Sequence, residues 1–408
     1  MMVDSYIKGQ MNMGKILFDF ASYQHNWQFN GGAEYGNVVL KRLLSMENKG
    51  NGLVFFENMT IDEGEIKDVI NSGWKVHPIR YFREILSIVK KEGYETIYSP
   101  LPYVTEWEYI GKRCSAKFIG TFHDVRNIET EYYRLSEESW FKENKVNDCD
   151  FIYGRGSESE NIEIGNYKKT LMAFESKKII AVSEYSKNAL LYYFPSISLD
   201  EIETLYSPNK RSNGTLPDEE EKLFFKSMGV DKNNYGLLLG GSIYYKNALR
   251  GVLAFDSLFD TKREYIPDSY KVIVVGVNDP GIYMGRLRHI DRFVFLKRIE
   301  TEKLESLYKN AHMLLYPSLS EGFGYPPIEA MKYGTICACS AGTSISEICG
   351  NMVVYFNPFL INEIAVAILK CFSNSIRSDL KQKIEIGLPL VNKRQEKDLD
   401  RLIEIITE

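Results

Sequence analysis

The chain has 408 residues, of which 44% are hydrophobic and 13% aromatic, and its 50 Lys and Arg nearly balance its 55 Asp and Glu, giving a formal net charge of −5. This length and apolar content exclude a disordered chain and favour two folded domains, and the balanced charge argues against nucleic acid as a partner. No apolar run approaches the roughly 18 residues of a membrane span, and the first residues lack the apolar core of a secretory signal, so we expect a cytoplasmic protein.

The first part of the chain alternates short apolar strands with helical stretches. Residues 15–20 (KILFDF) predict a strand, and the glycine pair Gly31 and Gly32 then precedes a helix. Apolar strands and a helical stretch alternate again through residues 53–99. This alternation is typical of a parallel sheet with crossover helices.

A histidine follows the next predicted strand. Residues 117–121 (KFIGT) form an apolar run that ends at Phe122, His123 and Asp124. Because ligands of open α/β sheets gather at the carboxyl ends of the strands, His123 is a candidate site residue.

The segment 125–170 is polar, aromatic and longer than a simple connection between elements. A long loop at a site usually carries specificity, although an ordinary helical excursion remains open. Asp148 and Asp150 form an Asp-x-Asp pair in this segment, and we predict that they are solvated and hold no metal ion. After the predicted strand 178–182, Ser186 is a candidate helix cap, and the turn-rich residues 207–217 predict a linker between domains.

A second strand, glycine loop and helix follows the linker. Residues 235–239 predict the strand, and the loop GGSIYYKN places Lys246 beside a helix start. A lysine in that position can neutralise a diphosphate that gains charge as a bound group leaves it. The alternative is that Lys246 is an ordinary lysine on the protein surface and binds no ligand. Residues 270–277 and 292–298 predict two further strands of this domain.

Residues 313–334 (MLLYPSLSEGFGYPPIEAMKYG) predict a third unit of the same kind. The apolar run 313–316 ends at a proline and a polar, glycine-bearing loop follows. Pro326 and Pro327 suit the first helical turn, where a missing N–H costs nothing, and Gly334 suits the left-handed position just past a helix end.

Two carboxylates belong to this unit. Glu321 lies in the loop and Glu329 in the first turns of the helix, while Gly322 and Gly324 allow the backbone to approach a ligand closely. A helix start attracts phosphate. Carboxylates beside a phosphate do not bind the anion, so we expect both to accept hydrogen bonds from hydroxyl groups of a polyol.

Three cysteines follow the unit. Cys337, Cys339 and Cys349 lie close together in sequence, but their spacing matches no known zinc pattern. Cys337 and Cys339 belong to the apolar run TICACS, which predicts buried, reduced cysteines on a strand.

The residues SEGFGYPPIEAMKYG (320–334), with seven residues between Glu321 and Glu329, resemble the Glu-x7-Glu signature of the retaining glycosyltransferases of family four. The segment SAGTSISEICGNMVVYFNP (340–358) resembles the continuation in that family. The resemblance implies the α/β GT-B fold, in which two Rossmann-like domains with parallel sheets face each other and a C-terminal helix crosses back. We therefore expect an acceptor-side domain at 1–206, a linker and domain entry at 207–234, a donor-binding domain at 235–385 and the crossover helix at 386–408.

The resemblance also implies a site. It assigns catalytic roles to His123, Lys246 and Glu321. Donor-binding roles fall to Gly31, Gly32, Ser242, Lys246, Asn247, Gly322, Phe323, Gly324, Tyr325 and Glu329. A plain turn is the alternative for Gly31 and Gly32. Thr343, Ser344 and Glu347 are expected to frame the sugar pocket.

The chain departs from the family pattern twice. The arginine often found a few residues before the Lys246-Asn247 pair is replaced around Gly241 and Ser242, and Arg250 is the expected substitute. The Asn-Gly turn common at residues 206–209 is absent, which affects the expected geometry of the domain hinge.

The implied function is transfer of a hexose from a nucleoside diphosphate sugar, UDP- or GDP-linked, to an acceptor hydroxyl with retention of anomeric configuration. The implied acceptor is a glycan or a polyprenyl-linked glycan, which would bring the protein to the inner face of the cell membrane as a peripheral protein. No cofactor and no metal ion are expected. The alternatives are a non-catalytic GT-B subunit that supports a partner transferase and, less well matched to the signature, a phosphorylase or a sugar-nucleotide epimerase.

Overall fold

A parallel sheet of seven strands forms the core of the first domain, in the order β3-β2-β1-β4-β5-β6-β7. The structure, a computed structural model, describes residues 14–24, 31–46, 50–59, 63–102, 106–126, 128–129, 139, 142, 173–210, 212–262 and 264–408. The strands are β1 (Ile16–Asp19), β2 (Gly52–Phe56), β3 (Lys75–Ile79), β4 (Thr96–Ser99), β5 (Lys117–Phe122), β6 (Lys177–Ala181) and β7 (Ile202–Thr204). The helices of this domain include α1 (Gly31–Leu44), α2 (Glu63–Asn71), α3 (Ile85–Glu92), α4 (Trp107–Gly111) and α8 (Glu184–Tyr193).

The second domain has a parallel sheet of six strands in the order β10-β9-β8-β11-β12-β13. Its strands are β8 (Tyr235–Leu239), β9 (Lys271–Val275), β10 (Phe293–Leu296), β11 (Met313–Tyr316), β12 (Ile336–Ser340) and β13 (Val354–Phe356). Its helices are α9 (Asp218–Met228), α10 (Ala248–Thr261), α11 (Gly281–Met284), α12 (Thr301–Asn310), α13 (Tyr325–Met331), α14 (Thr343–Cys349) and α15 (Ile361–Phe372).

Both sheets follow from continuous apolar runs. All residues of β1, β11 and β12 are buried. Strands that are covered on both faces are apolar at every position, whereas half-exposed strands alternate. The alternation of strands and helices in the sequence therefore correctly predicted two parallel α/β sheets, and the expected α/β architecture of two domains is confirmed.

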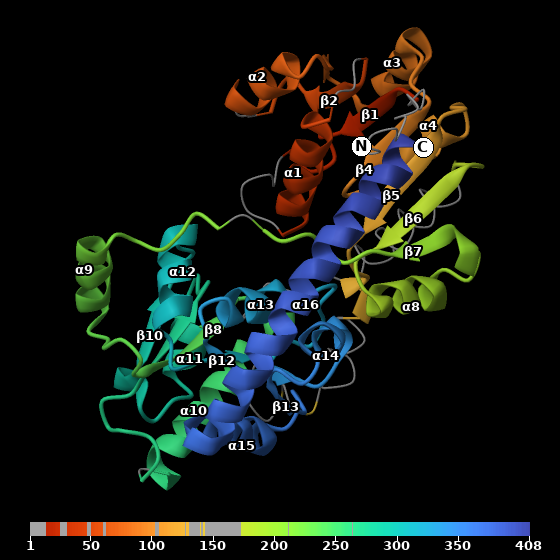
Figure 1. The fold of residues 1–408 in the computed structure, drawn as a ribbon. Helices are drawn as coiled ribbons and strands as arrows, with labels where there is room; N and C mark the ends of the chain where they lie inside the picture. The colour runs from red at the N-terminus through yellow and green to blue at the C-terminus, as the bar shows by residue number, and fades with distance from the viewer. Residues whose placement is uncertain are drawn as a thin grey trace, which may run out of the picture.

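The last helix joins the two domains. Helix α16 (Asn374–Thr407) has 34 residues and begins directly after α15. Figure 1 shows it running from the second domain along the first, so that the chain ends beside the sheet of the first domain. The crossing helix expected at 386–408 is thus the second part of one longer helix.

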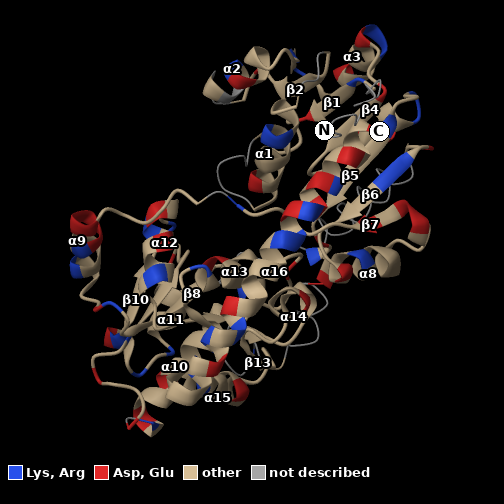
Figure 2. Ribbon diagram, in the orientation of Figure 1, with Lys and Arg blue, Asp and Glu red and all other residues tan. Residues whose placement is uncertain are grey.

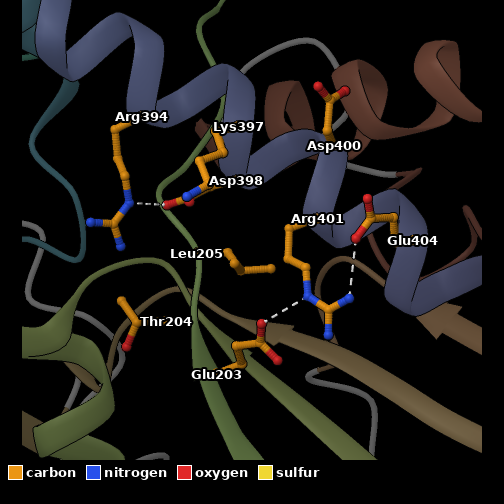
Figure 3. Close-up of a pocket in the computed structure, with 9 residues that line it drawn as sticks. All are labelled: Glu203, Thr204, Leu205, Arg394, Lys397, Asp398, Asp400, Arg401 and Glu404. Carbon is orange, nitrogen blue, oxygen red and sulfur yellow. Dashed lines mark hydrogen bonds and ion pairs between the residues drawn. The ribbon is translucent and has the colours of Figure 1, made fainter.

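Polar contacts fix α16 to the end of the first sheet. Asp398 accepts a hydrogen bond from the backbone N–H of Tyr206 (2.9 Å), and the Gln395 amide donates to the carbonyl oxygen of Ser207 (2.6 Å). A cavity of about 560 Å³ lies between β7 and α16. Figure 3 shows that its arginines already face carboxylates, with Arg401 reaching Glu203. Because these arginines are paired, we interpret the cavity as part of the packing contact between α16 and β7.

The cysteine prediction is confirmed. Cys337, Cys339 and Cys349 are fully buried and free, and burial raises the pKa of the Cys337 and Cys339 thiols.

Within the described ranges, no helix combines the length and the apolar character needed to cross a membrane. Acidic and basic residues are mixed along the helices in the view of Figure 2.

Candidate functional site

The site lies where loops at the carboxyl ends of β5, β8 and β11 meet between the two domains. The expected strand, loop and helix at 313–334 is confirmed as β11, a loop and α13. Gly324 precedes α13 with φ +90° and Gly334 follows it with φ +76°, and the two prolines occupy its start. These are the positions that glycine and proline favour, which is why the local sequence predicted the unit.

Glu321 is the most strongly held carboxylate of the site. Its Oε1 accepts hydrogen bonds from the Lys246 Nζ, the Tyr316 hydroxyl and the Ser318 hydroxyl, each at 2.6 Å. Burial acts to raise the pKa of Glu321, but the positive charges of Lys246 and Arg126 outweigh it and hold that pKa below its ordinary value. Glu321 is therefore a carboxylate fixed in one orientation.

Lys246 reaches Glu321 from the loop after β8. Its Nζ also donates to the Tyr316 hydroxyl (2.9 Å). Gly240, with φ +73°, lies under the lysine stem, because a Cβ there would come within 2.4 Å of the Lys246 Cγ. The strands β8 and β11 are direct neighbours, so the residues after them share one edge of the sheet. This adjacency brings Lys246 and Glu321 together.

Two other predicted donor-binding residues hold the loops in place. The Asn247 amide donates to the carbonyl oxygens of Pro317 (3.0 Å) and Pro358 (2.8 Å), and the backbone at Asn247 is left-handed with φ +56°. The Ser242 hydroxyl accepts a hydrogen bond from the backbone N–H of Asn278 (2.7 Å). Both side chains thus connect loops that follow different strands of the second sheet.

Arg250, the expected substitute for the missing family arginine, lies in the interior of the second domain. It lies within α10, is 1% exposed, and donates to the Asn247 Oδ1 (3.1 Å). The arginine whose charge acts on Glu321 is instead Arg126 of the first domain, which sequence reasoning missed.

His123 follows β5 and faces the second domain with its backbone. Its Nε2 donates to the carbonyl oxygen of Pro100 (3.1 Å), and its ring packs edge-on against Tyr35. Burial lowers the pKa of His123 to about 4, so the imidazole is neutral at pH 7. A Cβ on Gly322 would lie 2.0 Å from the His123 carbonyl oxygen, which shows how closely the loops of the two domains approach.

The start of α8 closes the contact between the domains. The Ser183 hydroxyl donates to the Gly322 carbonyl oxygen (2.7 Å), and the Glu347 carboxylate accepts the backbone N–H groups of Glu184 (3.0 Å) and Tyr185 (3.1 Å). Glu347, expected near the sugar pocket, therefore binds a helix start across the interface. The helix cap is Ser183 and not Ser186, because α8 begins at Glu184 and Ser183 accepts from the N–H three residues on.

The two remaining residues named with Glu347 flank the Glu321 loop. The Ser344 hydroxyl donates to the Glu321 carbonyl oxygen (2.8 Å), and Thr343, at the start of α14, has φ +56°. Ser344 thus holds the backbone of the loop that carries Glu321.

Glu329 lies in a second cluster at the interface. Lys210 of the linker pairs with Glu329 (3.0 Å) and with Glu34 of α1 (3.1 Å), and the Tyr308 hydroxyl donates to Glu329 (3.0 Å). Burial acts to raise the pKa of Glu329, but Lys210 outweighs it and the pKa lies below its ordinary value. Nothing in the local sequence around Lys210 or Glu34 pointed to this cluster.

The predicted glycines and aromatic residues line the same interface. Gly31 begins α1 and faces Tyr325, at 3.9 Å from a Cβ built on the glycine, whereas Gly32 packs on Leu101. Phe323 is 4% exposed and its ring contacts Tyr325. The Tyr325 hydroxyl donates to the Pro208 carbonyl oxygen (2.9 Å). These residues connect α1, the linker and α13.

Most of the segment 125–170, predicted to face the acceptor, lies outside the described residues, as do Asp148 and Asp150. Among the residues that the structure describes, no group of three His, Cys, Asp or Glu side chains is arranged to hold a metal ion.

The lowered pKa of His123 predicts a pH effect on stability. Between pH 6.5, its ordinary pKa, and about 4, the unfolded histidine binds a proton that the folded one does not, so stability falls as the pH falls through this window. The free energy of unfolding should drop by about 3 kcal/mol for this group. In His123→Gln that drop should be absent, as urea unfolding at several pH values would show. The contribution of His312, whose pKa is also lowered to about 4, remains in both proteins. Equal pH slopes would contradict the lowered pKa of His123.

Residues 219–385 match the family model described as glycosyl transferases group 1. A segment of 187 residues is 29% identical to the O-antigen chain mannosyltransferase RfbU of Salmonella typhimurium and covers 45% of this chain and 47% of that protein. A segment of 219 residues is 26% identical to an uncharacterized glycosyltransferase of Methanocaldococcus jannaschii and covers 50% of this chain and 51% of that protein. The chain spans about half the length of the curated relatives it matches.

Solved structures match over nearly the whole chain. A glycosyltransferase from Rickettsia africae has a TM-score of 0.62 and 16% identity, and the match covers 97% of this chain and 99% of that chain. HepE of Anabaena, in complex with UDP and glucose, has a TM-score of 0.61 and 15% identity, with 95% and 100% coverage. At such identities the likeness concerns the fold alone. The chain therefore has the GT-B fold of glycosyltransferases, and its residues 219–385 match the model of glycosyl transferases group 1.

Proposed function

We propose that the protein is a glycosyltransferase that moves a hexose from a nucleoside diphosphate sugar to a hydroxyl group of a glycan, with retention of anomeric configuration. The observation that carries the proposal is the pairing of Lys246 with Glu321 at 2.6 Å, on loops at the carboxyl ends of adjacent strands and against the His123 loop of the other domain. A cation for phosphate and a carboxylate for sugar hydroxyls are then side by side. The match of residues 219–385 to a glycosyltransferase family model supports the same function.

Four side chains of the site and one backbone segment have roles in this proposal. Lys246, with backbone N–H groups at residues 322–325, binds the diphosphate and stabilises it as it leaves. The Glu321 carboxylate accepts hydrogen bonds from hydroxyls of the donor sugar, and Glu329 accepts those of the ribose. Neutral His123 contacts the sugar from the first domain, so the site is complete only when the domains are in contact.

The bond changes need no protein nucleophile. The bond from the anomeric carbon to the diphosphate oxygen breaks, and the acceptor oxygen bonds to that carbon on the same face. The departing diphosphate oxygen takes the acceptor proton. In binding the diphosphate, the Lys246 ammonium exchanges part of its contact with Glu321 for phosphate oxygens, which leaves Glu321 able to accept from the sugar.

The relatives suggest substrates to test. RfbU is an O-antigen chain mannosyltransferase and HepE binds UDP and glucose, so GDP- and UDP-linked hexoses are the first donors to try. We propose a glycan acceptor, including polyprenyl-linked glycans at the inner face of the cell membrane.

A ligand panel tests the proposal. Thermal unfolding is measured with UDP, GDP, ADP and dTDP and with their sugars, since a ligand at one hundred times its dissociation constant adds about 2.7 kcal/mol of stability. We expect one nucleotide to stabilise the protein selectively and Glu329→Ala to lose that effect. Transfer and the anomeric configuration of the product are then read by NMR with the selected donor. If no nucleotide stabilises the protein and no sugar is transferred, the proposal is wrong and a non-catalytic subunit is the better interpretation.

Independence from metal ions is a separate expectation. Because Lys246 supplies the positive charge for the leaving diphosphate, the transfer rate with the selected donor should be unchanged after dialysis against EDTA. Readdition of Mg²⁺ or Mn²⁺ is the control. A rate that is lost with EDTA and restored by either ion would show that a divalent cation shares this role.

A further inference from the structure

Arg126 of the first domain projects onto the loop that carries Lys246. It lies three residues after His123, and its guanidinium donates to the Tyr245 hydroxyl (2.5 Å). The same group pairs with Asp124, whose Oδ1 also accepts the Arg126 backbone N–H (3.1 Å). An arginine of one domain is thus held in a defined orientation against the other domain.

Two cations from different domains share one aromatic ring. The Arg126 guanidinium carbon lies 4.6 Å from the centroid of the Tyr245 ring, and the Lys246 Nζ lies 5.4 Å from it. The positive charge of Arg126 also acts on Glu321, where it helps to hold the pKa of that carboxyl below its ordinary value. Arg126, Lys246 and Glu321 therefore belong to one electrostatic cluster.

The Arg126 side chain is only partly buried in this cluster. The Arg126 side chain keeps 29% of its surface exposed, more than the 16% of Lys246. A planar guanidinium presents paired N–H donors that match two oxygens of a phosphate group, and it stays charged at any pH at which the protein is folded. A group of this kind, beside the expected diphosphate, suits binding of that anion as well as contact between domains.

We propose that Arg126 binds the diphosphate of the donor together with Lys246, as a second cation supplied by the opposite domain. This inference rests on the proposed function, since it takes a nucleoside diphosphate as the ligand. It also means that the positive charge for the leaving group is completed only when the domains are in contact. Asp124 and Tyr245 then act as positioning residues for the guanidinium.

Binding of a nucleotide and of its uncharged nucleoside tests the proposal. The probes are UDP with uridine and GDP with guanosine, measured by calorimetry and ligand-observed NMR on the full chain. For the nucleotide that binds, Arg126→Gln should lower the affinity on the order of 10- to 100-fold, the usual result of removing one close charge partner. The affinity for the nucleoside should be unchanged. Arg126→Lys, which keeps the charge without the planar fork, should lose less.

Two further variants separate binding from structure. Arg126→Gln with Asp124→Asn leaves no carboxylate without its partner, and it should show the same loss of diphosphate affinity as the single variant. Arg401→Gln removes another arginine that crosses between α16 and the first sheet, through Glu203 (3.2 Å), away from the site. It should bind the diphosphate normally.

The outcomes separate the inference from the proposed function. If the native protein binds none of UDP, GDP, ADP and dTDP and transfers no sugar, both are wrong. If the native protein binds a diphosphate and Arg126→Gln binds it equally well, or loses nucleoside and diphosphate affinity alike, the proposed function survives and the role of Arg126 is only structural.

Discussion

Replacing Lys246 with methionine should lower kcat on the order of 100- to 1000-fold, the size of effect seen when one preorganised donor to a developing anion is removed. The variant should also lose about 3–5 kcal/mol of stability, because a buried charge loses its partner. The Glu321 side chain is 7% exposed and the Lys246 Nζ is 2.6 Å from it. Steady-state kinetics with the selected donor and urea unfolding measure the two effects.

Two controls accompany this variant. Lys383 pairs with Asp379 at the same 2.6 Å, but the two side chains are 37% and 56% exposed, so Lys383→Met should change stability and rate very little. Lys246→Met combined with Glu321→Gln removes both charges and should recover most of the stability without the activity. A Lys246→Met enzyme with native kcat would show that Lys246 does not stabilise the leaving group.

Replacing Gly322 with alanine should lower kcat/KM on the order of 100-fold, the cost typical of displacing reacting groups by about 1 Å. The added Cβ would lie 2.0 Å from the His123 carbonyl oxygen and 2.8 Å from its carbonyl carbon. These are backbone atoms and cannot turn aside, so the loops of the two domains must separate. The kinetics of sugar transfer measure the loss.

Gly342→Ala is the matched control for that variant. Gly342 directly precedes α14, has an extended backbone with φ −166°, and has no atom within 4 Å of a Cβ built on it. It should retain native kcat/KM. If Gly322→Ala is equally active, the close contact between Gly322 and His123 is not required for catalysis.

The sequence predicted the site best in two places. One is the helix α13, whose ends are marked by proline and glycine, and the other is the pair of loops that follow the neighbouring strands β8 and β11. Pro326, Pro327 and Gly334 marked the start and end of α13, because each residue occupies a backbone position that few others favour. The adjacency of Lys246 and Glu321 is consistent with their place after two apolar runs, since carboxyl ends of neighbouring parallel strands meet at one sheet edge.

Other parts of the site could not be predicted from the sequence. Arg250 lies close to Lys246 in the sequence, as expected for a substitute arginine. Its position on α10, however, directs its side chain into the interior, where it donates to Asn247. The sequence predicts Glu347 near the sugar pocket, but only the structure shows that its carboxylate binds the start of α8 across the interface. In both cases the direction of a side chain, which depends on packing, decided the outcome.

The sequence by itself determined two parallel α/β sheets, the unit of β11 and α13, the burial of the cysteines and the loops that carry Lys246, Glu321 and His123. These features depend on apolar periodicity and on backbone preferences within short segments. Only the tertiary structure decided that Arg126 meets Tyr245, that Lys210 joins Glu34 to Glu329, and that Gly322 touches His123. Such contacts join residues far apart in the chain, and they depend on how one folded domain meets the other, which no local pattern encodes.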